Sequence, residues 1–202
     1  MIAVVDYGAG NVCSVMHALE HIGAPSILTR DAGEIARADA VILPGVGAFG
    51  DAMEQLGSSG TITAMERFLE TGRPFLGICI GEQLLFERSE ESPGSRGLSW
   101  LRGSVRRIPA GPGRKVPHMG WNEIEICQKD PLFAGLPEKP YFYFVHSYYV
   151  QAQDPSCVLA RVRYGVDMDV AVRRNNLYAV QFHPEKSGAC GLQLLQNFAA
   201  MR

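Results

Sequence analysis

The chain has 202 residues, of which 47% are hydrophobic and 20% charged, and its 19 basic and 21 acidic side chains leave a formal net charge of −2. This length is enough for one domain with a sizeable core, and the balanced charge argues against nucleic-acid binding. No stretch of the sequence approaches about 18 uninterrupted apolar residues, so we expect a cytoplasmic protein without a membrane span.

The first 80 residues alternate short apolar runs with segments of helical periodicity. Strands are predicted at residues 2–5, 26–29, 40–43 and 74–78. After the first strand, apolar residues at positions 12, 15, 16, 19 and 22 recur as one helix face, with Asn11 as the expected N-cap and Gly23 at the end. Another helix is predicted from Ala48. Strands that alternate with helices predict a parallel sheet covered on both faces.

The second half has a different pattern. Strand-like runs follow one another with turns between them, at residues 124–127, 141–149, 158–164, 170–173 and 178–182. A last amphipathic helix, with Leu192, Leu195, Phe198 and Ala199 on one face, is expected to pack on the sheet. We therefore predict an α/β fold, an open and mostly parallel twisted sheet with flanking helices, with additional antiparallel strands in the C-terminal half. One domain is expected to span residues 1–202.

A possible nucleophile lies in Gly77-Ile78-Cys79-Ile80-Gly81, directly after an apolar strand and before a helical run. In a G-x-nucleophile-x-G pattern, a sharp strand-to-helix turn projects the central side chain above the sheet. The adjacent helix N-terminus favours the thiolate form of Cys79. The alternative is a buried structural cysteine, but the strand, pentapeptide and helix together favour the nucleophile.

A cysteine nucleophile needs a base, and His183 closes an apolar strand with Glu185 two residues later. On an extended backbone these two side chains share a face, so the carboxylate would orient the imidazole. Taken alone, a strand-end histidine bonded to a carbonyl explains His183 equally well. With the cysteine turn, Cys79, His183 and Glu185 indicate an acyl-transfer triad.

An oxyanion hole is predicted at Pro44-Gly45-Val46-Gly47, which follows the strand at residues 40–43. One donor would be the N–H of Ile80, and the other the N–H of Val46 or Gly47. Alone, this segment is also consistent with a simple tight turn.

Other motifs are incomplete. Residues 8–13 begin like a dinucleotide-binding fingerprint but carry Cys13 where the third glycine belongs. His17 and His21 lie four residues apart without an evident third ligand. The basic residues between 102 and 115 are better explained as a solvated or partner-facing edge. We therefore predict no cofactor and no metal.

Together these motifs resemble those of the class I (triad) glutamine amidotransferases, which have a flavodoxin-like fold. The resemblance covers nearly the whole chain. Within that family, the blocks Pro117-His118-Met119-Gly120-Trp121-Asn122 and His146-Ser147-Tyr148-Tyr149 are similar to those of the glutaminases that serve imidazole glycerol phosphate synthase.

The resemblance implies that Cys79 attacks the side-chain amide of glutamine, that His183 transfers the protons and that Glu185 supports the imidazolium. It implies glutamine contacts from Gly45, Gln83, Ser147 and Tyr148, and a partner surface that includes Asn11, Trp121, Tyr143 and Lys186. The implied partner is a (β/α)₈ cyclase in a heterodimer. The cyclase would receive ammonia through a sealed passage and make imidazole glycerol phosphate and aminoimidazole carboxamide ribonucleotide in histidine biosynthesis.

One residue departs from the family pattern, because Glu82 stands where methionine is more common. An anion there would oppose the thiolate unless it points to solvent or meets a cation, and we expect no loss of activity. Because Gly45 and Gly47 can act as hinge points, we also expect one oxyanion donor to be turned away in the free chain.

Three alternatives remain open. The first is a related triad glutaminase that serves cell-surface sugar amidination or pyridoxal phosphate synthesis, the latter disfavoured by the block at residues 117–122. The second is a catalytically silent regulatory subunit, disfavoured by the complete triad. The third is a cysteine peptidase or a DJ-1-like protein that shares the strand-to-helix turn, disfavoured because His183 and Glu185 lie near the C-terminus.

Overall fold

Parallel strands form one half of the larger sheet in the computed structural model, which describes residues 1–8, 10–111 and 113–201. Their order is β2 (Ser26–Thr29), β1 (Ile2–Val5), β3 (Ala40–Leu43), β4 (Phe75–Ile78) and β12 (Leu177–Val180). All residues of β1, β3, β4 and β12 are buried. Continuous apolar runs of this kind are typical of strands covered on both faces.

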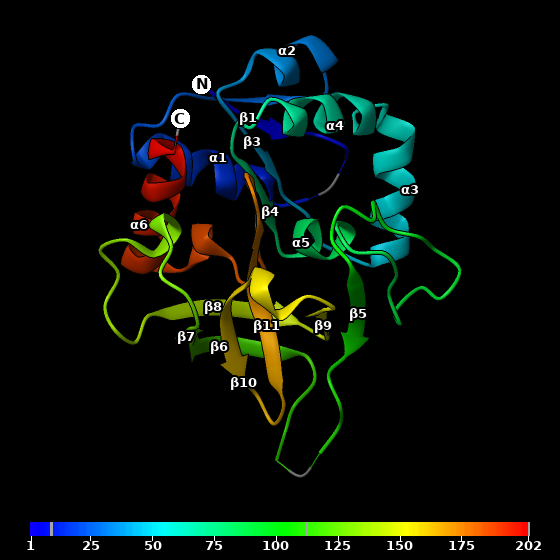
Figure 1. Ribbon diagram of the computed structural model, residues 1–202, viewed down its shortest axis with the longest axis vertical. Coiled ribbons are helices and arrows are strands. Elements are labelled where there is room, and N and C mark those ends of the chain that lie inside the picture. The colour runs from blue at the N-terminus through cyan, green and yellow to red at the C-terminus, as the bar shows by residue number, and fades with distance from the viewer. Residues whose placement is uncertain (9, 112, 202) are drawn as a thin grey trace.

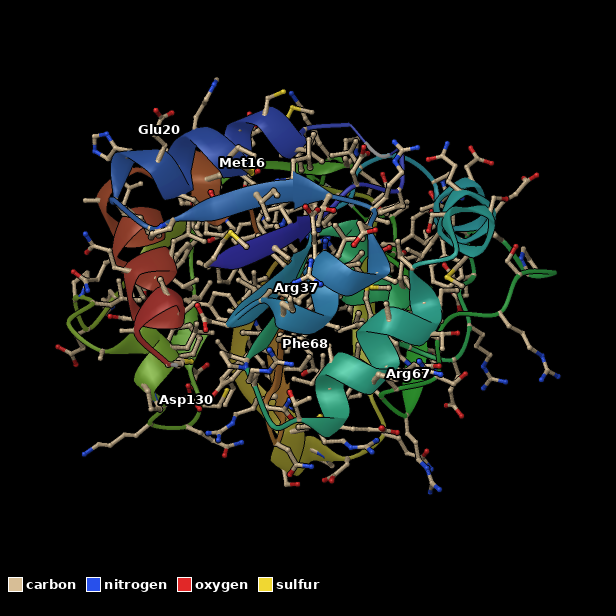
Figure 2. All side chains as sticks on the ribbon, turned by 90° about the horizontal axis from the view of Figure 1, so that it is seen from above. Met16, Glu20, Arg37, Arg67, Phe68 and Asp130 are labelled. Carbon is tan, nitrogen blue, oxygen red and sulfur yellow. The ribbon has the colours of Figure 1, made fainter. Side chains whose placement is uncertain are left out.

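Helices flank these strands (Figure 1). They are α1 (Val12–His21), α2 (Ala32–Arg37), α3 (Phe49–Ser59), α4 (Ile62–Glu70), α5 (Ile80–Leu84) and α6 (Gly188–Ala200). The helix α1 packs beside α6, and α2 packs against α4. Figure 2 places Met16 and Glu20 of α1 on one side of β2 and Phe68 of α4 on the other. This arrangement confirms the predicted two-sided cover.

Antiparallel strands continue the sheet beyond β12. They are β11 (Asp167–Arg174), β10 (Val158–Arg163) and β7 (Glu125–Ile126), while β9 (Tyr148–Ala152) pairs with β11 and β5 (Gly103–Arg107) pairs with β9. Figure 1 shows these strands in the lower half of the molecule, below the parallel strands and their helices. The predicted fold class, with its antiparallel C-terminal half, is confirmed.

A separate antiparallel ribbon is formed by β6 (His118–Glu123) and β8 (Tyr141–His146). Phe142 of β8 stacks on Phe182, with ring centroids 4.0 Å apart, so the ribbon packs against the segment that follows β12. We predicted one strand over residues 141–149, but Ser147 divides it into β8 and β9, which belong to different sheets. The strand-like pattern continues across Ser147 because aromatic and β-branched residues occur on both sides of it.

One loop bears on the site described below. The loop at residues 88–97 is tied to α3, because Glu91 and Ser92 accept hydrogen bonds from the Phe49 and Gly50 backbone N–H groups. These N–H groups in the first turn of α3 have no partner within the helix.

The sequence pattern does not predict α2, β5 or β6. Within the described residues, no helix has the length and apolar character that crossing a membrane requires.

Candidate active site

Cys79 lies in the sharp turn between β4 and α5, with φ 56° and ψ −112°. Positive φ is costly for a residue with a side chain, and such strain concentrates at functional sites. The flanking glycines are required by the close approach of neighbouring chain. A Cβ atom at Gly77 would lie 2.7 Å from the Gly81 carbonyl oxygen, and one at Gly81 would lie 1.9 Å from the Leu43 carbonyl oxygen. The predicted strand-to-helix turn is therefore present.

The Cys79 side chain, 5% exposed, lines a cavity of about 320 Å³. Of the residues predicted for the site, the cavity is also lined by Val46, Gly47, Ile80, Gln83, Ser147, Tyr148 and His183. Gly45 does not line it and instead lies against Tyr7, whose hydroxyl would be 2.5 Å from a Cβ atom at Gly45. The structure thus brings together residues from four separate segments of the chain.

The imidazole of His183 bonds to Glu185 through Nδ1, 2.8 Å from Oε1, and both side chains are buried. Within the described part of the chain its Nε2 atom has no hydrogen-bond partner, and His183 lines the same cavity as Cys79. Burial lowers the pKa of His183, but the neighbouring Cys79 and Glu185 raise it by more, to about 10. The imidazole is therefore protonated at neutral pH and can stabilise a thiolate beside it.

The prediction that His183 and Glu185 share one face of an extended backbone is wrong. The strand β12 ends at Val180, and Pro184–Lys186 forms a turn of 3₁₀-helix (η3) rather than extended chain. Proline suits the first position of such a turn because its φ is already near the helical value. The carboxylate of Glu185 therefore reaches back to His183 within a turn, not along one face of a strand.

Asn11 does not cap α1 as predicted. It occupies the N-cap position with a left-handed backbone, φ 68°, and its side chain makes no capping bond. Instead, Asn11 Nδ2 donates to Glu185 Oε1 at 2.7 Å, the same oxygen that contacts His183. The other carboxylate oxygen, Oε2, has no hydrogen-bond partner. Asn11, expected at a partner surface, thus contacts the predicted triad directly.

The amide of Gln83 has a defined orientation. Its Nε2 donates to the Tyr148 carbonyl at 3.1 Å and to Gln181 Oε1 at 2.8 Å. Gln181 in turn directs its own Nε2 at Cys79 Sγ, 3.8 Å away. The Oε1 atom of Gln83 is a buried acceptor that has no partner in residues 1–8, 10–111 and 113–201, and Gln83 lines the cavity.

Glu82 meets neither solvent nor a cation, contrary to the two possibilities considered from the sequence. Its side chain is fully buried in the first turn of α5, and neither carboxyl oxygen has a hydrogen-bond partner among the residues that the structure describes. Burial, with smaller contributions from Cys79 and Asp169, holds the pKa of this carboxyl well above its usual value. A protonated Glu82 carries no charge and therefore does not oppose a thiolate at Cys79.

Three polar residues in or beside the cavity are not predicted by the sequence motifs. Glu91 and His146 line it, and Gln181 contacts the nucleophile. Glu91 lies in a Ser- and Glu-rich loop whose composition predicts only surface structure. A polar residue next to a buried strand end, as at Gln181, was the available signal. The orientation of the Val46 and Gly47 N–H groups in the free chain stays a prediction, although φ at Gly47 is 96°.

The residues predicted to face a partner lie near the triad. Trp121 is 55% exposed, and its ring contacts that of Tyr143, with centroids 6.2 Å apart. Lys186 is exposed and follows Glu185 directly. Met119 and Tyr141, on the same ribbon, are also exposed. An exposed apolar patch of this kind on a folded chain is characteristic of an interaction surface.

This fold, with a cysteine in a strand-to-helix turn beside a histidine–glutamate pair, defines a class of amide-cleaving enzymes. The chain belongs to the class I glutamine amidotransferase family, whose description "Glutamine amidotransferase class-I" it matches over residues 3–201. The predicted resemblance to that family is confirmed.

Two curated relatives are similar over almost their full length. Imidazole glycerol phosphate synthase subunit HisH of Moorella thermoacetica is 49% identical over 99% of this chain and 94% of the relative. The protein of the same name from Thermosynechococcus vestitus is 50% identical over 99% of this chain and 96% of the relative.

A solved structure also shows the fold. The PurLQS structure from Thermotoga maritima has a TM-score of 0.74 and 20% identity, and the match covers 98% of this chain and 96% of that one.

Proposed function

We propose that this chain is the glutaminase subunit of an imidazole glycerol phosphate synthase. It would hydrolyse glutamine to glutamate and ammonia and pass the ammonia to a cyclase subunit. The observation that carries the proposal is the accessible cavity at Cys79, into which His183, backed by Glu185, also faces. The similarity to two HisH subunits, 49% and 50% identical, supports the choice of synthase.

The first half-reaction forms a thioester. The Cys79 thiolate attacks the side-chain amide carbon of glutamine, and the carbonyl oxygen becomes an oxyanion held by N–H groups of Ile80 and of Val46 or Gly47. His183, protonated at rest, gives its proton to the departing nitrogen. The C–N bond breaks, ammonia leaves, and a γ-glutamyl thioester and a neutral imidazole remain.

The second half-reaction hydrolyses the thioester. Neutral His183 takes a proton from water, whose oxygen attacks the thioester carbon. Collapse of the tetrahedral intermediate breaks the C–S bond, releases glutamate and restores the thiolate beside the imidazolium. Glu185 supports the imidazolium in both steps, because its Oε1 lies 2.8 Å from Nδ1.

The glutamine site follows from the groups that line the cavity. Gln83 presents only its Oε1 atom, because both amide protons are used by Tyr148 and Gln181. An acceptor in that position suits an N–H group of the substrate. The carboxylate of Glu91 lines the same cavity and complements the α-ammonium group. Ser147 and Tyr148 complete the site, and Gly45 would support the turn that carries Val46 and Gly47.

A partner surface would include Trp121, Tyr143, Lys186 and Asn11. The partner would be a (β/α)₈ cyclase in a heterodimer, and its contact would exclude water from the path of the ammonia, since protonated ammonia is no longer a nucleophile. One domain spanning residues 1–202 would suffice for this role. A soluble biosynthetic complex of this kind places the chain in the cytoplasm.

The proposal is tested with Cys79→Ala in the complex with the cyclase. Loss of the sulfur should abolish glutamine-dependent synthesis, because no thioester can form, while synthesis from added ammonium salts continues. The measurement is the rate of imidazole glycerol phosphate formation with each nitrogen source. If both activities fell together, Cys79 would have a structural role instead.

A further inference from the structure

Two buried histidines near the cavity have no part in the chemistry described above. His118 of β6 and His146 of β8 lie opposite each other in the ribbon, and they are 3% and 6% exposed. His118 Nδ1 and His146 Nε2 are 2.9 Å apart. His146 also lines the cavity that holds Cys79. A hydrogen-bonded pair of histidines beside a substrate cavity needs an explanation.

Hydrogen bonds run in a row from Asn122 through His118 and His146 to Tyr148. The contacts at the two ends of this row decide which atom donates in each bond. At one end, Asn122 Oδ1 accepts from the Glu123 backbone N–H at 2.9 Å, so Nδ2 is the atom that faces His118 Nε2 at 3.2 Å. At the other end, His146 Nδ1 lies 2.8 Å from the Tyr148 carbonyl oxygen. A backbone N–H only donates and a carbonyl only accepts.

The contacts of Asn122 and Tyr148 require the same tautomers of His118 and His146. Because the Tyr148 carbonyl accepts, His146 carries its proton on Nδ1 and its Nε2 is an acceptor. His118 must then donate from Nδ1, which leaves its Nε2 to accept from Asn122. Both histidines are neutral in this scheme, and each ring nitrogen has one matched partner.

The surroundings favour the neutral state. His118 stacks between Phe144 and Tyr164, with ring centroids 4.8 Å and 4.1 Å away. Burial lowers the pKa of His118 to about 4 and that of His146 to about 3. No ion pair joins either ring to a carboxylate among the described residues. The pair is thus uncharged at neutral pH.

The Tyr148 carbonyl links this pair to the glutamine site. That oxygen accepts from His146 Nδ1 and also from Gln83 Nε2, at 2.8 Å and 3.1 Å. The second proton of Gln83 Nε2 is held by Gln181. The Gln83 amide therefore keeps its Oε1 atom free only while the Tyr148 peptide stays where His146 holds it.

We infer that His146, with its tautomer set by His118, is a positioning residue of the glutamine site: its Nδ1–H group holds the Tyr148 carbonyl and, through it, the Gln83 amide. The inference rests on the proposed function, because it concerns how glutamine is bound. Neither histidine touches the reacting atoms in this scheme, so its loss should affect glutamine binding more than the chemical steps.

The test compares His146→Leu with His146→Asn in the complex with the cyclase. The two replacements have nearly the same shape, but only asparagine keeps a donor where Nδ1–H was. Losing the Nδ1–H donor should let the Tyr148 peptide shift and raise KM for glutamine by about 10- to 100-fold in His146→Leu, with kcat within about threefold. His146→Asn should keep KM within about threefold of the unmodified chain.

Asn176→Leu is the matched control for destabilisation. Asn176 Nδ2 donates to the Leu69 and Arg73 carbonyls at the opposite end of the sheet from Cys79, so a change to leucine removes part-buried hydrogen bonds there. It should lower the free energy of unfolding and leave KM for glutamine unchanged. Equal KM values in the two His146 variants, or a raised KM in Asn176→Leu, would overturn the positioning role.

The tautomers of His118 and His146 can also be measured in the unmodified chain, so this test does not depend on whether a variant folds. Nitrogen-15 NMR at neutral pH should show His118 and His146 both neutral and both protonated on Nδ1. A proton on Nε2 of either ring, or an imidazolium, would overturn the assignment. An unmodified complex without glutaminase turnover would instead contradict the proposed function. Normal turnover with equal KM values in the two variants would contradict only the positioning role.

Discussion

At the scale of single residues, Glu82 is a buried carboxyl without a partner, three positions after the nucleophile. The pKa of this carboxyl is raised in the folded chain from 4.5. Its contribution to the free energy of unfolding is therefore lost as the pH rises above that value. Glu82→Met should therefore raise the free energy of unfolding by about 1–3 kcal/mol near neutral pH, with glutaminase activity kept.

Urea unfolding of Glu82→Met and of the unmodified chain, at about pH 5 and about pH 8, checks this. The gain should be larger at the higher pH, where the unfolded carboxyl is ionised and the buried one resists ionisation. An equal gain at both pH values would mean that the effect comes from packing and not from the carboxyl.

Asn11 is the second residue whose contacts predict an effect. Its bond to Glu185 Oε1 holds the carboxylate that orients His183. A hydrogen bond to a charged group contributes about 1.5–3 kcal/mol, so Asn11→Ala should lower kcat by about tenfold or more. Glutamine turnover in the complex is the measurement.

Cys13→Ala is the control for Asn11, because Cys13 is exposed on the first turn of the same helix. It should leave turnover unchanged. Turnover in Asn11→Ala equal to that of the control would show that Glu185 is held without the amide.

At the scale of elements, two helical glycines should respond to alanine in opposite directions. Gly81, in α5, has the Leu43 carbonyl oxygen 1.9 Å from the position of an added Cβ atom, whereas Gly57, in α3, has nothing within 4 Å. Gly81→Ala should therefore destabilise the fold by about 1–3 kcal/mol. Gly57→Ala should stabilise it by about 0.5–1 kcal/mol, because glycine is unfavourable within a helix.

Thermal and urea unfolding of the two variants provides the measurement. Opposite signs are expected because α5 packs directly on the end of β3, while Gly57 has open space beside it. A stabilised Gly81→Ala would mean that the turn after β4 has room to move away from β3.

At the scale of the whole molecule, buried histidines predict how stability depends on pH. The pKa values of His118 and His146 are lowered from 6.5 to about 4 and about 3, so the stability that they contribute is lost as the pH falls below 6.5. The free energy of unfolding should therefore fall as the pH falls below 6.5.

Each of the two neutral histidines should contribute a slope of up to about 1.4 kcal/mol per pH unit on the acid side. Urea unfolding across this range measures the slope. His118→Phe, which keeps an aromatic ring between Phe144 and Tyr164, should flatten the acid side. An unchanged slope would show that His118 is not a buried neutral group in the folded chain.

The sequence by itself determined the features that depend on neighbouring residues. Apolar runs located β1, β3 and β4 to within one residue, because a strand buried on both faces reads as a near-continuous apolar stretch. The glycines around Cys79 indicated the strand-to-helix turn because only glycine fits there. The short spacing of His183 and Glu185 predicted their contact, although not the 3₁₀ turn that makes it.

Only the tertiary structure decided contacts between distant parts of the chain. Asn11 and Glu185 are 174 residues apart, and Gln83 and Gln181 are 98 apart. Periodicity and turn signals report local conformation, whereas strand order and register decide which distant side chains meet. The same limit explains the burial of Glu82, because a helix pattern shows which face turns inward only after the sheet beneath it has been assembled.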